Sequence, residues 1–234
     1  MIISVLVIAT GKYKEFVQQL LNGIDWYFML NYKIEINLFT DKFREWKESD
    51  RMRIIQHIIP PYKFPEATLL RYKIFKTIPI EKYGNYIFYL DADMSIVNVV
   101  GDEILGDITA VLHPGYYNKG WGDEGTVEQS KAYIPKQERG KYCAGGFQGG
   151  KTSIYYRAIE KMAEDIEEDR KEGIMAEWHD ESHWNWYLHT TNEKITILSP
   201  SYCMPEALWK RKLWGVNQFE PKILALEKEE DIRE

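Results

Sequence analysis

The feature that most constrains the fold is an almost wholly apolar run near the start of the chain. Between Ile2 and Ile8 the only polar residue is Ser4, and five of the seven residues are β-branched. A strand with apolar side chains on both faces is typical of a parallel sheet that helices cover on each side. The run therefore predicts a buried strand of an α/β fold.

Strand and helix patterns go on alternating up to residue 90. After Thr10-Gly11, apolar residues recur at helical spacing, and residues 34–40 then alternate as a strand. The helical positions are Phe16, Leu20, Ile24 and Phe28. A third apolar run covers 54–59, a helical stretch runs from 66 to about 77, and a further strand covers 86–90. This alternation predicts the α/β class, with a mostly parallel sheet and flanking helices.

The rest of the chain consists of shorter pieces. Residues 108–112 predict a strand, about 114–139 a long polar loop, and 154–166 a helix whose acidic outer face is expected to be solvated surface. The glycine pairs at 145–146 and 149–150 either let a ligand approach the backbone or form tight turns. Residues after Pro221 are charged and lack periodicity, so we expect a flexible segment there.

Two carboxylates, Asp91 and Asp93, follow directly after the strand at 86–90. The carboxyl ends of strands are where an α/β sheet holds its ligand, and strand residues two apart share one face. If strand geometry persists, two like charges on one face favour a divalent cation between them, Mg²⁺ or Mn²⁺, which would carry a phosphate. The alternative is an ordinary solvated turn after a strand.

Composition argues against several classes of function. The chain has 234 residues, enough for one large domain or two small ones, and a formal net charge of −6. That charge argues against a nucleic-acid binder and gives no attraction to an anionic membrane. Cys143 and Cys203 form no disulfide framework or zinc motif, which favours a reducing compartment. Residues 1–9 carry neither a signal peptide nor a membrane span, so we expect a cytoplasmic protein.

The densest polar cluster lies at residues 178–185, where ionisable groups stand between Trp178 and Trp184. Tryptophan beside carboxylates suits sugars, because the ring stacks on CH groups while carboxylates accept hydroxyl hydrogens. Core packing is the alternative for Trp184. In a helix, His179 and His183 would share one face, like half of a zinc-binding HExxH motif. Two acidic residues stand where that motif needs a lone Glu, so zinc proteolysis is disfavoured.

Six short motifs follow one another between residues 91 and 202. They are Asp91-Ala92-Asp93, His113-Pro114-Gly115-Tyr116-Tyr117, Ala132-Tyr133-Ile134-Pro135, Gly145-Gly146-Phe147-Gln148-Gly149-Gly150, Trp178-His179-Asp180-Glu181-Ser182-His183-Trp184-Asn185 and Leu198-Ser199-Pro200-Ser201-Tyr202. In this order they resemble the family 6 glycosyltransferases, which include the ABO blood-group and α1,3-galactosyltransferase enzymes and microbial relatives. The likeness covers roughly residues 5–205.

The resemblance implies a GT-A fold, which is a single domain with a Rossmann-like nucleotide-binding sheet. It also implies transfer of N-acetylgalactosamine or galactose from a UDP donor to a galactoside acceptor, with or without fucose. The new bond would be α1,3, formed with retention and with Mn²⁺ or, as a second choice, Mg²⁺. Residues 1–97 would be the UDP-binding half and 98–220 the acceptor-binding half, with 221–234 as a charged tail.

The resemblance also assigns roles to single residues. Donor contacts are implied at Ile8, Thr10, Tyr13, Arg71, Asp91, Ala92, Asp93, Ala144, Gly145, Gly146 and Asp180, and acceptor contacts at His113, Trp178 and Glu181. Within these sets, Asp91 and Asp93 would bind the metal. Glu181 would be the catalytic carboxylate nearest the reacting sugar. Glycine at 146 goes with N-acetylgalactosamine in the blood-group enzymes, through the space that it leaves for the acetamido group.

The chain departs from the family pattern in three places. Residues 121–130 lack the Tyr-Glu-Arg-Arg segment typical before Ala-Tyr-Ile-Pro. The family's basic tail closes over UDP, whereas residues 227–234 are mixed and acidic, with Lys228 and Arg233 as the candidates for that role. The anchor and stem of the animal Golgi enzymes are missing, which suggests a microbial or viral enzyme, or a trimmed chain.

Three interpretations compete with N-acetylgalactosamine transfer. The first is the same reaction with UDP-galactose. The second is a haloacid-dehalogenase-like phosphatase, which also places Asp-x-Asp after an apolar strand, although usually earlier in the chain. The third is a non-catalytic sugar-binding protein that uses the aromatic residues alone. For a transferase, retention allows two routes: Glu181 attacks from the face opposite UDP, or it stabilises the cation during same-face return.

Overall fold

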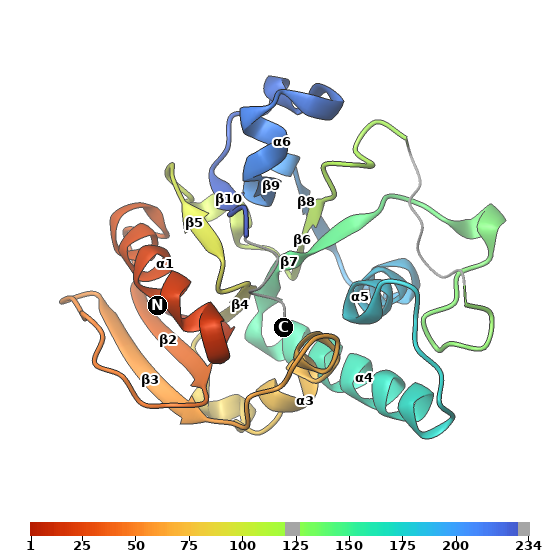
Figure 1. Ribbon diagram of the computed structural model, residues 1–234, viewed down its shortest axis with the longest axis horizontal. Coiled ribbons are helices and arrows are strands. Elements are labelled where there is room, and N and C mark those ends of the chain that lie inside the picture. The colour runs from red at the N-terminus through yellow and green to blue at the C-terminus, as the bar shows by residue number, and fades with distance from the viewer. Residues whose placement is uncertain (120–126, 229–234) are drawn as a thin grey trace.

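The computed structural model describes residues 1–119 and 127–228. Within them, seven strands form a central sheet in the order β3-β2-β1-β4-β7-β6-β8 (Figure 1). These strands are β1 (Ile2–Ala9), β2 (Lys33–Thr40), β3 (Met52–Ile58), β4 (Tyr86–Leu90), β6 (Ile108–Leu112), β7 (Cys143–Lys151) and β8 (Ile195–Leu198). Neighbours pair in parallel except β7, which is antiparallel to both β4 and β6. The expected α/β class with a mostly parallel sheet is confirmed.

Helices cover both faces of this sheet (Figure 1). They are α1 (Lys14–Tyr27), α2 (Glu66–Leu69), α3 (Arg71–Phe75), α4 (Thr152–Lys171), α5 (His179–Thr190) and α6 (Glu206–Lys210), with 3-10 turns η1 (Gly11–Tyr13), η2 (Ile80–Lys82), η3 (Asp102–Ile104), η4 (Lys136–Glu138), η5 (Pro200–Tyr202) and η6 (Leu213–Gln218). The helix expected over 66–77 is in fact two short helices that meet at Leu70. Across the described part of the chain, we find no helix with the length and apolar character needed to cross a membrane.

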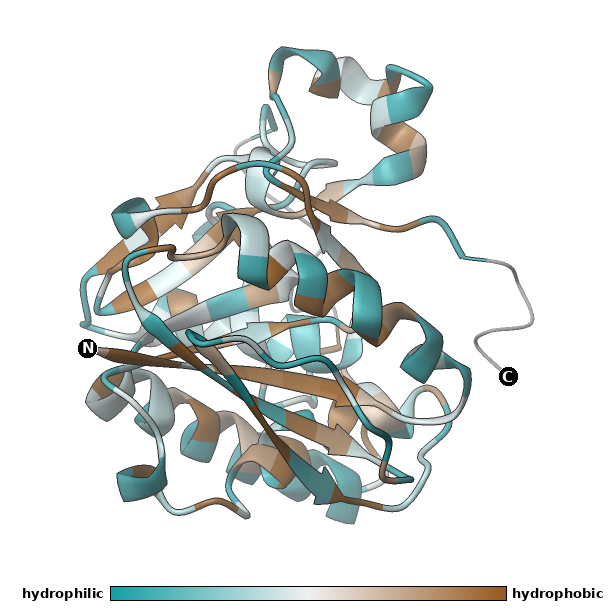
Figure 2. Cartoon of the chain, turned by 90° about the vertical axis from the view of Figure 1, so that its left-hand side faces the viewer, coloured by the Kyte–Doolittle hydropathy of each residue, from teal (hydrophilic) through white to brown (hydrophobic). Residues whose placement is uncertain are grey.

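Side chains of the central strands alternate between two hydrophobic clusters. In β1, Ile3, Val5 and Val7 belong to the cluster that α1 covers. Leu6 points to the opposite face, where α3, α4 and α5 supply residues such as Tyr155. Figure 2 shows the apolar colour along the central strands and polar colour on the outer faces of the helices. Each cluster draws residues from both halves of the sequence, so the chain folds as one domain.

A second sheet lies beside the first and contains the C-terminal part of the described chain. Among residues 1–119 and 127–228, its three strands are β5 (Met94–Ile96), β10 (Ile223–Ala225) and β9 (Met204–Pro205), in that order. β10 is antiparallel to β5 and parallel to β9, and Ile223 is fully buried. The expectation of a flexible segment is therefore wrong at 223–225, because a three-residue strand is too short to show a period.

The glycine-rich stretch 145–150 is a strand, so the alternative of tight turns is wrong. It forms most of β7, which pairs with a strand on each side. A Cβ on Gly149 would lie 2.3 Å from the carbonyl oxygen of Ile87. Gly150 has φ of +148°, and a Cβ there would lie 2.2 Å from the oxygen of Asp107. The glycines let three backbones approach one another closely.

Candidate active site

The site begins where the strand order reverses. Strand β2 pairs with one edge of β1, and β4 pairs with the other edge. In open α/β sheets, ligands bind at the carboxyl ends of the strands at such a switch point. η1 follows β1 there, and Asp91 follows β4. A pocket of about 590 Å³ opens at this place, a volume suited to a small-molecule ligand or cofactor.

Eight of the residues expected to contact a donor line this pocket: Ile8, Thr10, Tyr13, Arg71, Asp91, Ala92, Asp93 and Lys228. The pocket also has walls that sequence reasoning missed. These are Gly11, Lys12, Pro61, Tyr62, Lys63, Phe64, Ala67, Thr68 and Tyr89. Most come from the loop after β3 and from α2. The two consecutive prolines there mark the end of a strand but give no sign that the loop turns back over the sheet.

The acidic pair lies in a turn, so the expectation that strand geometry persists through Asp93 is wrong. β4 ends at Leu90, and the amide of Met94 donates to the carbonyl oxygen of Asp91 at 3.1 Å. This turn is not an ordinary solvated one either, because Asp93 is only 4% exposed. The Asp91 carboxylate accepts hydrogen bonds from Tyr89 and Arg71. Both carboxylates are therefore held beside the pocket.

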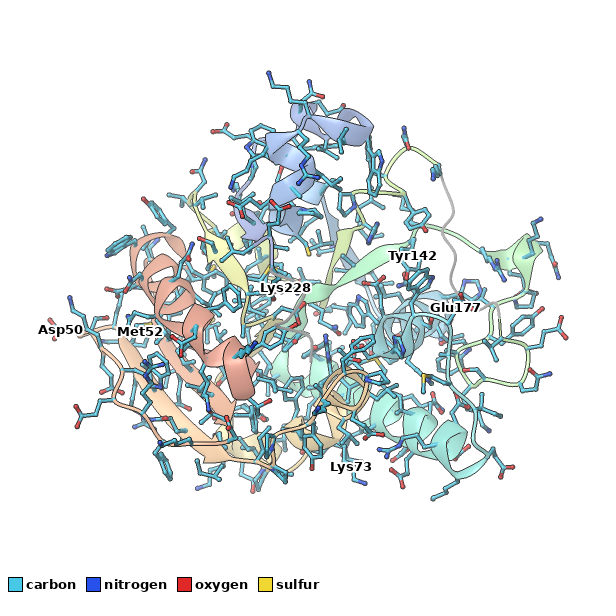
Figure 3. The ribbon with its side chains drawn as sticks, in the orientation of Figure 1. Asp50, Met52, Lys73, Tyr142, Glu177 and Lys228 are labelled. Atoms are coloured by element: carbon cyan, nitrogen blue, oxygen red, sulfur yellow. The ribbon has the colours of Figure 1, made fainter. Side chains whose placement is uncertain are left out.

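The last described residues pass over the acidic turn. The amide of Leu226 donates to the carbonyl oxygen of Asp93 at 2.9 Å, and the Lys228 ammonium forms an ion pair with the Asp93 carboxylate. The same ammonium lies 5.4 Å from the centre of the Tyr13 ring. Figure 3 labels Lys228 near the middle of the molecule. Burial and the neighbouring Asp91 raise the pKa of Asp93, and Lys228 opposes that rise. Arg233 lies outside the described residues.

The donor set of this turn fits a Mg²⁺ or Mn²⁺ ion that a diphosphate helps to bind. Among the described residues, no group of three or more His, Cys, Asp or Glu side chains could form a metal site from protein ligands alone. Two hard carboxylates at the edge of an open pocket leave the other positions to substrate phosphates and water, as Mg²⁺ sites often do.

Arg71 joins the acidic turn to helix α5. Its guanidinium lies 3.5 Å from Asp91 Oδ1, 3.1 Å from Asp180 Oδ2 and 3.2 Å from the carbonyl oxygen of Gly145. It also stacks 4.4 Å from the centre of the Tyr89 ring. Although burial disfavours its charge, the neighbouring carboxylates raise the pKa of Arg71 above its ordinary value. Burial raises the pKa of Asp180 to about 6 against the pull of Arg71.

Glu181 is fixed by hydrogen bonds to both of its carboxylate oxygens. The hydroxyl of Tyr142 donates to Oε1 at 2.5 Å, and the amide of Gly145 donates to Oε2 at 2.7 Å. Burial raises the pKa of Glu181, while these two donors lower it. Asn185, one turn later on α5, exchanges hydrogen bonds with the backbone of Cys143. Helix α5 is thereby tied to β7, which aims Glu181 at the site. Sequence reasoning missed Tyr142.

The residues expected to sort galactose from N-acetylgalactosamine lie on β7. A Cβ on Gly146 would lie 2.8 Å from Asp91 Oδ2 and 2.5 Å from Met94 Cε. A Cβ on Gly145 would lie 3.3 Å from Glu181 Oε2. Ala144 is buried beside them. The missing side chains thus let two carboxylates approach the strand, which is a reason for glycine here besides space for a donor sugar.

Of the other two residues expected to contact an acceptor, His113 lies next to Tyr142, the hydrogen-bond donor to Glu181, and Trp178 precedes Glu181 at the start of α5. The His113 ring lies 5.4 Å from the Tyr142 ring, and its Nδ1 accepts from the amide of Gly115 at 3.0 Å. Burial lowers the pKa of His113 to about 4, so the ring is neutral at pH 7 with its proton on Nε2. Trp178 is 46% exposed at the start of α5, whereas Trp184 is fully buried, which confirms core packing for Trp184.

The two histidines of α5 make separate contacts. The His183 ring is 1% exposed, and its Nε2 lies 3.4 Å from a carboxylate oxygen of Asp169 on α4. The His179 ring packs 5.0 Å from the ring of Phe64, in the loop after β3. His183 therefore belongs to the packing between α4 and α5, and His179 to the contact between α5 and the wall of the pocket.

Comparison with known proteins gives consistent matches. The model of the family described as Glycosyltransferase family 6 matches residues 1–223. Histo-blood group ABO system transferase 1 of Rattus norvegicus is 30% identical over 223 residues, covering 91% of this chain and 62% of that protein. Globoside alpha-1,3-N-acetylgalactosaminyltransferase 1 of Gallus gallus is also 30% identical, with 86% of this chain and 61% of that protein covered.

A bacterial relative matches over nearly its whole length. O-antigen biosynthesis glycosyltransferase WbnI of Escherichia coli is 28% identical, with 99% of this chain and 97% of that protein covered. By contrast, the chain spans about three fifths of the length of the two animal relatives.

Proposed function

The chain belongs to glycosyltransferase family 6, and from that membership we propose that it is a retaining α1,3-glycosyltransferase. It transfers N-acetylgalactosamine from a UDP donor to a galactoside acceptor and depends on Mn²⁺. The observation that carries the proposal is the ion-pair network of Arg71, whose guanidinium joins Asp91 at the pocket to Asp180 beside Glu181. The network thus connects Asp91, beside which the diphosphate of the donor would bind, with Asp180 and Glu181, which can face the sugar of the donor.

The pocket supports a nucleotide donor. Tyr13, Tyr62 and Phe64 offer aromatic surface, which suits a base and a ribose. Lys12 and Lys63 add positive charge to the same pocket. A diphosphate would lie toward the acidic turn, where Asp91 and Asp93 would hold the metal and Lys228 would approach the phosphates. When bound, the metal would neutralise charge on the departing UDP.

The carboxylate of Glu181 works on the sugar. In transfer, the bond between the sugar C1 and the β-phosphate oxygen breaks, and the acceptor hydroxyl oxygen forms the new bond to C1. Two routes give retention: Glu181 attacks C1 and is then displaced, or Glu181 stabilises the positive charge while the acceptor enters from the face that UDP leaves. In both routes Tyr142 and the Gly145 amide keep the carboxylate aimed. In both routes the acceptor enters on the UDP side, and a phosphate oxygen of the departing UDP would take the hydroxyl proton.

The donor sugar is the finer part of the proposal. The Gallus gallus relative is named for N-acetylgalactosamine transfer, which favours that sugar, as does glycine at 146. UDP-galactose is the alternative, and Alpha-1,3-galactosyltransferase 2 of Homo sapiens matches half of this chain at 26% identity. Initial rates with the two donors at equal concentration decide between them.

One assay tests the whole proposal. The protein is mixed with UDP-N-acetylgalactosamine or UDP-galactose and a galactoside, with and without a fucose branch, and UDP release is measured with Mn²⁺ and with chelator. Manganese-dependent release that requires the galactoside is the expected result. Phosphate release from monoesters would instead indicate the phosphatase, and galactoside binding without release of UDP or phosphate the non-catalytic sugar-binding protein.

A further inference from the structure

An exposed tryptophan in an unusual backbone conformation stands beside the proposed acceptor site. Trp214 in η6 has φ of +56° and is 61% exposed. Its neighbours Lys212 and Gly215 also have positive φ, at +52° and +73°. Bulky residues rarely adopt this conformation, and such outliers cluster at binding and catalytic sites. The chain therefore holds an indole in water at the cost of strain in its own backbone.

The backbone around this indole is anchored. The hydroxyl of Tyr117 donates to the carbonyl oxygen of Trp214 at 3.3 Å. Gln218 donates to the Tyr117 hydroxyl at 2.9 Å and to the carbonyl oxygen of Gly215 at 3.0 Å. The ring of Phe219 packs edge-on against Tyr117, with centres 4.9 Å apart. These contacts attach η6 to the loop that follows β6, and Figure 1 shows both near the same side of the sheet.

The indole lies against the turn that carries His113. A Cβ on Gly115 would be 3.2 Å from Trp214 Cζ3 and 3.2 Å from His113 Cε1. The absence of a side chain at Gly115 thus allows the indole and the imidazole to approach the same point from two sides. Because that imidazole is one of the expected acceptor contacts, the exposed indole continues the acceptor side of the site.

A series of rings connects Glu181 to Trp214. Tyr142 donates to the Glu181 carboxylate, and the His113 ring lies next, 5.4 Å from the Tyr142 ring. Trp214 follows beyond His113 across Gly115. The Tyr142 ring is 1% exposed, so a galactose that reacts beside Glu181 would meet the His113 ring. Trp214 lies farther from Glu181, at the distance where the sugar attached to that galactose would bind.

We propose that Trp214 is a specificity-determining residue that stacks on the second sugar of the acceptor, the one next to the reacting galactose. This inference rests on the proposed function. An exposed indole offers a flat apolar surface to the CH face of a pyranose. The acceptor class is then an oligosaccharide of at least two residues that ends in galactose, and a monosaccharide would not use this surface.

The test compares lactose with methyl β-galactoside as acceptors for Trp214→Ala. The KM for lactose should rise about tenfold, as expected for the loss of one stacked ring. The KM for methyl galactoside and the rate of donor hydrolysis without acceptor should stay unchanged. Trp214→Phe should restore most of the affinity for lactose. Trp26→Ala is the matched control, because Trp26 is 62% exposed on α1, and it should change neither KM.

Two results would overturn the inference. One is an equal rise in both KM values, which would mean a structural role for Trp214, and the other is no change in either. If the wild type releases no UDP with either donor, the proposed function fails. Calorimetric titration of the two galactosides into wild type and Trp214→Ala then tests Trp214 on its own. Weaker binding of lactose by the variant supports the inference, and equal or absent binding in both proteins overturns it.

Discussion

The proposed donor pocket and the proposed acceptor side of the site are built in different ways. The pocket lies at the ends of parallel strands, and the charged groups at its inner end are buried and paired: Arg71 is 5% exposed, Asp93 4%, and Asp180, the partner of Arg71, 4%. The acceptor side is formed by a loop, a helix start and a 3-10 turn, and its aromatic residues Trp178 and Trp214 are 46% and 61% exposed. One side is thus organised by buried ion pairs and the other by exposed aromatic rings.

The difference suggests which part of the site can change in evolution. A charge in the buried network cannot be replaced singly without leaving its partner unpaired, which costs several kcal/mol. A ring on the open surface can be exchanged at little cost to folding, because surface substitutions usually change stability by less than about 0.5 kcal/mol. We therefore expect relatives to keep the donor side and to vary the acceptor side. The predictions below test this contrast.

The largest expected effect comes from Glu181, where the two sides meet. Glu181→Gln keeps the shape of the side chain but removes the negative charge that faces the sugar. We expect kcat to fall about 10³-fold, as when a main electrostatic stabiliser of a transition state is lost. UDP binding should be largely kept, because the nucleotide end of the pocket is untouched. Single-turnover rates and UDP titration measure the two quantities separately.

A matched control for this change is Glu164→Gln on the exposed face of α4, whose side chain is 64% exposed. It should leave kcat unchanged. Near-normal turnover of Glu181→Gln would remove Glu181 from the mechanism and would place the boundary between the two sides elsewhere.

The second prediction tests whether the donor side is a network. Arg71→Ala leaves Asp180 buried without its partner, and loss of one partner of a buried pair costs about 3 to 5 kcal/mol. We expect the free energy of unfolding to fall by about 3 kcal/mol, the lower end of this range, because Asp180 can become neutral by binding a proton. Urea unfolding at pH 7 measures the loss. Arg157→Ala is the control: its pair with Glu193 is exposed, so a change below about 1 kcal/mol is expected. Equal losses would contradict the network.

The two sides also differ in how much of them the sequence predicts. The strands and the acidic pair follow from apolar runs and from the position of Asp91 after a buried strand, so the switch-point location could be inferred. The burial of Asp93 could not, because the residues that cover it, Leu226 and Lys228, lie far away in sequence. Tyr89 and Tyr142 were missed because a tyrosine in a strand or just before one has the same local pattern whether it fills the core or orients a carboxylate.

On the acceptor side, local patterns predict little. The acceptor roles of His113, Trp178 and Glu181 were expected from motif resemblance, although the charged cluster at residues 178–185 had already indicated a sugar site. The position of Trp214 could not be predicted from its neighbours in sequence. Its backbone accepts a hydrogen bond from Tyr117, which lies about a hundred positions earlier. The same limit applies to the glycine-rich strand β7, for which the alternative of tight turns was wrong. Its glycines are required by close approach of β4 and β6, which a single segment cannot reveal.

The third prediction concerns the metal at the acidic turn. Asp93→Asn removes one of the two charged ligands, so donor affinity measured with Mn²⁺ should fall about 100-fold and lose its dependence on Mn²⁺. The fold should survive, since the amide is nearly isosteric and Lys228 can move to solvent. Asp50→Asn, at the far edge of the molecule in Figure 3, is the control and should bind donor normally. Retained dependence on Mn²⁺ in Asp93→Asn would refute the assignment.

The smallest expected effect contrasts the neutral acceptor side with the charged donor side. Burial lowers the pKa of His113 to about 4, below its ordinary value of 6.5. Between those values the unfolded chain binds a proton that the folded chain rejects, so this group reduces stability as pH falls from 6.5 to 4. Urea unfolding at pH 7 and 4.5 should show wild type losing about 2 kcal/mol more of its free energy of unfolding than His113→Gln loses. His189→Gln, at an exposed position near Glu138, should lose as much free energy of unfolding between the two pH values as wild type does. If His113→Gln lost as much free energy of unfolding as wild type, burial would not be what keeps His113 neutral.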